Sequence, residues 1–131
     1  MNFLARAVRS LRESLEPAND AKLLLVEWDD IVIRVRTLDQ AVPGFWNQEV
    51  RWSDITRVCF GDGGVSKSDI LFLEALNREN PVYVLTEAQH GTEFLAQLVA
   101  RGLFPQKLLE KAIGSSSGEM LCWPPRQSEP H

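Results

Sequence analysis

The sequence is poor in the residues that most often build a catalytic or metal site. It has two histidines, His90 and His131, and two cysteines, Cys59 and Cys122. Zinc and related metal sites draw several ligands from these residue types. A nucleophile–histidine–acid set would depend on His90, which lies in a polar turn with no nucleophile motif nearby. We therefore expect no metal, no cofactor and no catalytic residues, and we predict that the chain is not an enzyme.

Long apolar segments and cysteine frameworks are also missing. The longest apolar runs, such as residues 23–26, have four residues, far too few to cross a bilayer. The first residues lack the apolar core and the cleavage site of a secretory signal. Two cysteines fit neither a disulfide framework nor the paired spacing of a zinc site. These features favour a cytoplasmic protein.

Basic charge is scarce in the middle of the chain. The formal net charge is −4, and residues 20–93 hold thirteen Asp/Glu against seven Lys/Arg, a net charge of −6 (7 − 13). Nucleic-acid binding needs a basic footprint, so we expect no nucleic-acid partner. Hydrophobic residues make up 44% of the 131 residues, which is typical of one folded domain. We predict a single domain over residues 1–123 and a disordered tail over 124–131.

The N-terminal segment has the pattern of an amphipathic helix over residues 2–15. Apolar residues form one helical stripe and three arginines lie opposite. The stripe consists of Phe3, Leu4, Ala7, Val8, Leu11 and Leu15. Such a helix packs either on the domain's own sheet or on an external partner or membrane surface, and the sequence leaves both possibilities open.

Residues 22–86 alternate between short apolar runs and turn signals, which predicts an antiparallel sheet of five to six strands. The runs at residues 23–28 and 31–36 are separated by Asp29-Asp30, which indicates a tight hairpin. One alternation of apolar and polar residues ends at Trp52, and another begins after Ser53-Asp54. This change of phase predicts a bend or bulge in the sheet. Further runs at 69–76 and 81–85 predict a second hairpin.

The last third of the chain has a helical pattern over residues 91–113. A helix begins either at the capping-box spacing of residues 86–89 or at Gly91-Thr92, and it ends near Gly102. Pro105 suits the first turn of a second short helix. Residues 120–123 are predicted to form a short apolar clip.

Two features are candidate partner-binding surfaces. Phe45 and Trp46 follow a Pro-Gly turn, where they either plug the end of the sheet or join a recognition surface. Asp29, Asp30 and Asp62 belong to the acidic central region, either as solvated turn residues or as a surface that attracts a basic partner.

The order of strands followed by a helix resembles the pleckstrin-homology-like architecture, a bent sheet or half-barrel closed by a C-terminal helix. The segments 52–58, 69–73, 82–84 and 86–91 also resemble those of small bacterial proteins of unknown function, over about residues 22–103. The resemblance implies a bent sheet closed by a C-terminal helix, and the N-terminal helix and the second C-terminal helix lie outside it. We predict an α+β fold in which the N-terminal helix and a C-terminal helix pack on the sheet. Proteins of this architecture mostly bind lipid headgroups, peptides or proteins.

The sequence thus predicts a non-catalytic protein-interaction module. One alternative is an immunity-type protein that neutralises a basic toxin through its acidic surface. Another is a peripheral membrane protein anchored by residues 2–15.

Overall fold

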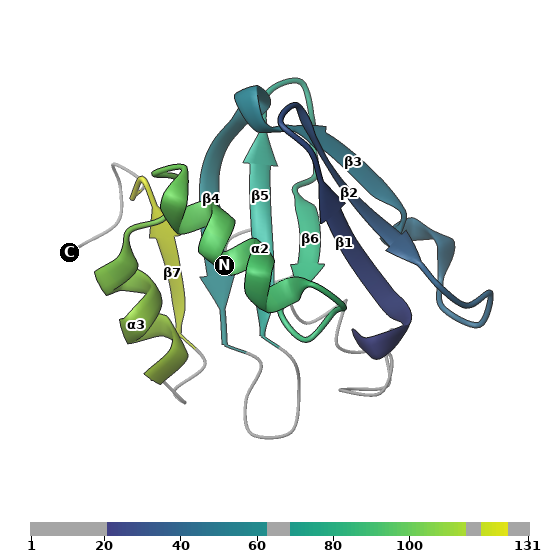
Figure 1. Cartoon of the computed structure of the whole chain (residues 1–131). Helices are drawn as coiled ribbons and strands as arrows, with labels where there is room; N and C mark the ends of the chain where they lie inside the picture. Colours follow the sequence, from purple (N-terminus) through teal and green to yellow (C-terminus); the bar gives the residue numbers. More distant parts are fainter. Residues whose placement is uncertain (1–20, 63–68, 115–118, 126–131) are drawn as a thin grey trace.

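The computed structural model describes residues 21–62, 69–114 and 119–125, which form two antiparallel sheets and two helices (Figure 1). The α+β class with antiparallel sheets is therefore confirmed. The predicted helix over residues 2–15 and residues 126–131 of the predicted tail lie outside the described residues.

The first sheet has three strands in the order β1-β2-β3. They are β1 Leu24–Trp28, β2 Val32–Thr37 and β3 Gln48–Arg51. The predicted hairpin joins β1 to β2, and Trp28 lies opposite Ile33 at its closed end. Buried and exposed positions alternate along β2, as expected for a strand with one face on the core.

The bend predicted around Trp52 joins the two sheets. Trp52–Asp54 forms a 3-10 turn between β3 and the next strand, β4 Ile55–Gly61. The pairing register of β4 shifts between Ile55 and Arg57. This irregularity explains why Ile55 is out of phase with Val58, because an extra residue in one strand reverses the alternation.

The second sheet has four strands in the order β6-β5-β4-β7. The other three are β5 Ile70–Ala75, β6 Val82–Leu85 and β7 Met120–Trp123. Leu71 and Leu73 of β5 belong to the main core, while Ile70 and Phe72 pack in a second cluster on the opposite face. The first four residues of β5 are therefore buried on both faces, and all four are apolar.

The structure corrects the predicted strand count. Its described residues form seven strands in two sheets, where the sequence predicted one bent sheet of five to six. Residues 120–123 were predicted as an apolar clip, and they instead form β7, which pairs with β4 from Val58↔Trp123 to Gly61↔Met120.

Two helices follow β6. Helix α2, Gly91–Ala100, crosses the sheet and buries Phe94 and Leu98, and α3, Gln106–Gly114, lies beside β7 (Figure 1). Helix α2 begins at the later of the two predicted starts. The earlier start is not used because the Gln89 backbone bonds to β1, with Gln89 N donating to Leu24 O and Val26 N donating to Gln89 O.

A side-chain amide ties the open side of β6 to the first sheet. Gln48 at the start of β3 accepts a hydrogen bond from Tyr83 N at 2.7 Å and donates one to Tyr83 O at 3.0 Å. The amide therefore satisfies the backbone of Tyr83 much as a neighbouring strand would.

Cys59 of β4 and Cys122 of β7 lie directly opposite each other and form a disulfide. This bond was not predicted from the sequence, because the cysteines are 63 residues apart and two cysteines make no recognisable framework. Disulfides are rare in reducing compartments, so the cysteine content no longer supports the expected cytoplasmic location.

Candidate functional site

The predicted loop aromatics separate into one buried and one exposed ring. Gly44–Trp46 forms a 3-10 turn in which Trp46 is fully buried beside Tyr83, with ring centroids 6.4 Å apart. Phe45 is 47% exposed and packs on Trp46. Trp46 therefore belongs to the core, as in the plugging alternative, and Phe45 remains accessible.

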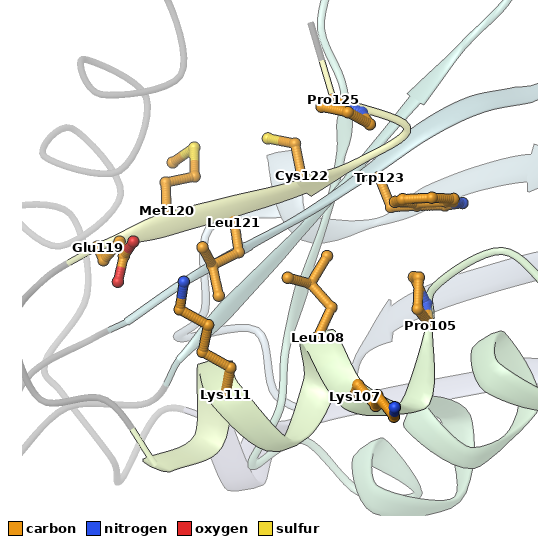
Figure 2. Close-up of a pocket in the computed structure, with 10 residues that line it drawn as sticks. All are labelled: Pro105, Lys107, Leu108, Lys111, Glu119, Met120, Leu121, Cys122, Trp123 and Pro125. Atoms are coloured by element: carbon orange, nitrogen blue, oxygen red, sulfur yellow. The ribbon is translucent and has the colours of Figure 1, made fainter. Parts of the chain in front are cut away.

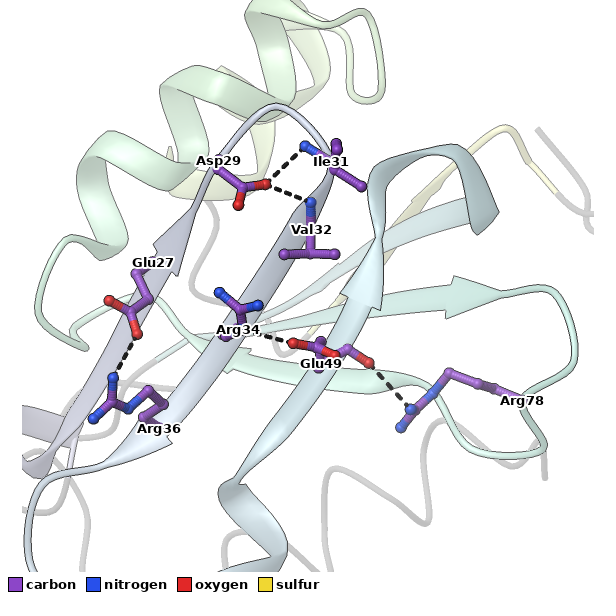
Figure 3. A network of polar contacts seen from close by, with 8 residues as sticks. All are labelled: Glu27, Asp29, Ile31, Val32, Arg34, Arg36, Glu49 and Arg78. Atoms are coloured by element: carbon purple, nitrogen blue, oxygen red, sulfur yellow. Dashed lines mark hydrogen bonds and ion pairs between the residues drawn. The ribbon is translucent and has the colours of Figure 1, made fainter.

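Asp29 and Asp30 lie at the tip of the β1–β2 hairpin. The Asp29 Oδ1 atom accepts hydrogen bonds from Ile31 N and Val32 N, both at 2.8 Å (Figure 3). These bonds, the one from Val32 first, lower the pKa of Asp29 below its usual value. Asp29 thus shapes the turn and Asp30 is exposed.

Other carboxylates of the first sheet are paired with arginines of β2. Arg36 contacts Glu27 at 2.9 Å and Arg34 contacts Glu49 at 2.5 Å, on the exposed face of the strands (Figure 3). This pairing neutralises much of the acidic charge that the sequence places here. The carboxylates of this sheet that form no ion pair with these arginines are those of Asp29 and Asp30 at the hairpin tip.

Asp62 lies away from the other two predicted aspartates. Asp62 follows the last residue of β4, whereas the hairpin tip lies near the first residue of β4. The side chain of Asp62 is buried. Within residues 21–62, 69–114 and 119–125, no three His, Cys, Asp or Glu side chains come close enough together to hold a metal ion. The predicted aspartates therefore do not form one site.

A hollow of about 420 Å³ lies next to the hairpin tip. We call it the corner site, and it is lined by Asp30, Ile31, Trp52, Ser53, Arg101 and Leu103. Ile31 is 64% exposed, the largest exposed fraction among the large hydrophobic side chains of the described residues. The Trp52 Nε1–H donates to Asp29 O at 2.8 Å, and the Arg101 guanidinium lies 3.9 Å from the Trp52 ring centroid. These contacts fix the wall of the hollow.

Only part of the corner site was predicted from the sequence. Asp30 was predicted as a candidate, and Trp52 was placed at the predicted bend. Arg101 and Leu103 were missed because they follow α2, about fifty residues farther along the chain. No local pattern indicates that the end of a helix will meet a hairpin tip.

A larger hollow of about 640 Å³, the α3–β7 groove, lies between α3 and β7 (Figure 2). Leu108 of α3 faces Leu121 of β7, and Trp123 at one end is 41% exposed. The remaining lining residues are Pro105, Lys107, Lys111, Glu119, Met120, Cys122 and Pro125. This groove was not predicted from the sequence, because β7 was not recognised as a strand.

A comparison with protein-family models, curated proteins and solved structures finds no significant match to the chain. None of the helices in the described part of the chain is long and apolar enough to span a membrane. Function must therefore be inferred from the surfaces themselves.

Proposed function

We propose that the chain is a protein-interaction module and that the corner site binds its partner. The observation that carries this proposal is Ile31, an exposed aliphatic side chain beside a hollow with a fixed tryptophan in its wall. Protein interfaces commonly combine an apolar anchor with a preformed pocket and a polar rim. The corner site has all three, with Asp30, Ser53 and Arg101 as its polar lining residues and Asp29 next to Asp30 at the hairpin tip.

The charges at the hairpin tip indicate what kind of partner would fit. Asp29 is held ionised by the backbone hydrogen bonds of its turn, and Asp30 adds a second carboxylate beside it. A partner that places an apolar side chain against Ile31 and a Lys or Arg beside Asp30 would complement both features.

Affinity capture of the tagged full-length chain in its native cells tests the proposal. We expect wild-type protein to retain a defined partner and the Asp30→Ala/Ile31→Ser double variant to lose it. Both side chains are exposed, so the variant should fold normally. Ile113→Ser, which changes an equally exposed aliphatic residue on α3, is the matched control and should retain the partner.

Two results would contradict the proposal. One is an identical set of captured proteins for wild type and the double variant. The other is turnover of a substrate in a broad hydrolase and transferase screen that disappears on substitution of a single carboxylate, because an interaction module needs no such activity.

The adjacent carboxylates at the hairpin tip favour one more specific function, that of an immunity-type protein bound to a basic toxin. Steering between opposite charges would make association fast and sensitive to salt. The encoding gene should then lie beside a toxin gene, and association with that toxin should slow markedly as salt rises. A rate that does not change with salt would count against this alternative.

A further inference from the structure

We propose that the α3–β7 groove is a second binding surface, which takes an acidic, extended peptide segment of another protein as an added strand on β7. This inference goes beyond the corner site, which shares no lining residue with the groove. It combines three properties of the groove: an open strand edge, an apolar floor and a pair of lysines.

The strand edge comes first. β7 pairs with β4 on one side, and none of the other described strands pairs with it on the opposite side. Within the described residues, no strand occupies the backbone N–H and C=O groups on that side, which are the groups that an added strand binds. Such strand addition supplies affinity through main-chain bonds, while neighbouring pockets select the side chains.

The apolar floor suits alternate side chains of such a segment. Leu121 and Trp123 of β7 turn toward α3, whereas Met120 and Cys122 turn away (Figure 2). A strand added next to β7 has the same alternation, so every second side chain faces α3. Apolar side chains on that face would lie next to Leu108 and Leu121, and acidic ones next to Lys107 and Lys111 of α3.

The lysines give the groove its selectivity. Lys107 and Lys111 are four residues apart on α3, which places them about 6 Å apart along the helix axis. Alternate side chains of an extended chain repeat at about 6.6 Å, nearly the same spacing. Neither lysine forms an ion pair with another described residue, and the one carboxylate that lines the groove is Glu119. The groove is thus locally basic in a chain of net charge −4.

This charge favours an acidic partner over two other occupants. A second copy of the chain paired edge to edge would bring its own Lys107 and Lys111 toward the same pair. The segment 2–15 carries Arg6, Arg9 and Arg12, which the lysines would repel. An acidic segment gains attraction from the same groups.

A fluorescent peptide of about ten residues, with Val and Glu interspersed on one face of the extended chain and Thr on the other, tests the proposal by anisotropy with the full-length protein. We expect saturable binding that weakens with added salt, and a loss of at least about tenfold in affinity for Lys107→Glu/Lys111→Glu. Lys22→Glu makes one of the same charge reversals on an exposed residue near β1 and should bind like wild type. Equal affinity of the groove variant and wild type would overturn the proposal.

A second pair of peptides tests strand addition itself. A peptide with proline at alternate Val positions keeps the charge but loses amide donors and should bind at least about tenfold more weakly. Binding of the parent peptide should shift the amide NMR signals of residues 120–123. Equal binding of the proline peptide, or unchanged signals, would show a purely electrostatic contact and overturn the proposal.

Two further experiments separate peptide binding in the groove from membrane binding and from partner binding at the corner site. Vesicles containing phosphatidylserine should not replace the peptide. Lysine-dependent vesicle binding without peptide binding would assign the groove to a membrane surface and overturn the proposal. The Asp30→Ala/Ile31→Ser variant should bind the peptide normally, so failure at the corner site and failure in the groove give different results.

Discussion

Trp52 both packs in the core and forms a hydrogen bond to the hairpin. Its ring packs against Phe94 of α2, with centroids 5.8 Å apart, and its Nε1–H donates to the hairpin backbone. The Arg101 guanidinium lies over the ring, 3.9 Å from its centroid. Trp52 thus links the bend between the sheets, the hairpin tip and the end of α2, and the corner site depends on it.

Replacing Trp52 by Ala should lower the free energy of unfolding by about 3–5 kcal/mol, because it removes a buried aromatic side chain and leaves a cavity. Guanidinium denaturation followed by circular dichroism measures the change. Trp52→Phe keeps most of the ring but loses the indole hydrogen bond, so it should cost less. A loss under about 1 kcal/mol for Trp52→Ala would mean that the ring contributes little to the core.

Asp29 should make the stability of the hairpin depend on pH. Hydrogen bonds to its carboxylate lower its pKa from the usual 3.8. The stabilisation is therefore fully present above pH 3.8 and is lost as pH falls through the lower pKa of the folded state. The difference in melting temperature between wild type and Asp29→Asn should be largest near neutral pH and shrink in acid. Asp30→Asn serves as control, and a constant difference for Asp29→Asn from pH 7 to pH 2 would contradict this account.

At the level of elements, Gly91 sets where α2 begins. A Cβ atom at this position would collide with the carbonyl of Thr86, which belongs to the turn after β6. His90 before it has a left-handed backbone conformation, with φ of 67°. The chain therefore turns tightly between β6 and α2, and the helix starts at Gly91.

Substituting Gly91 by Ala should destabilise the protein by about 1–3 kcal/mol, because the turn must shift to admit the methyl group. Thermal or chemical denaturation measures this loss. Gly114 at the end of α3 has no neighbouring atom within 4 Å of an added Cβ, so Gly114→Ala is the matched control and should be nearly neutral. Equal effects of the two substitutions would rule out a steric cause.

The strands that the sequence predicted are those bounded by clear turn signals. β1, β2, β5 and β6 were found because runs of branched and aromatic residues lie between such signals. β7 was missed because four apolar residues after a serine-rich stretch carry no period of their own. It becomes a strand through its pairing with β4, and the α3–β7 groove could not be predicted without it.

For the whole molecule, the disulfide between Cys59 of β4 and Cys122 of β7 is the one covalent cross-link. Reduction should lower the free energy of unfolding by about 2–4 kcal/mol, since the cross-link restricts the unfolded chain over 63 residues. Denaturation with and without a phosphine reductant measures the effect. The Cys59→Ala/Cys122→Ala variant should not respond to reductant, and an unchanged midpoint for reduced wild-type protein would contradict the prediction.

The two outer strands of the four-stranded sheet differ in a way that limits assembly. On β6 the Gln48 amide already holds both backbone groups of Tyr83, whereas β7 has no such cap among the described residues. A strand of a partner can therefore pair with β7, whereas the backbone of Tyr83 on β6 is already bonded to Gln48. Strand addition to this sheet should therefore stop at one bound strand per molecule, and the complexes should not grow into filaments.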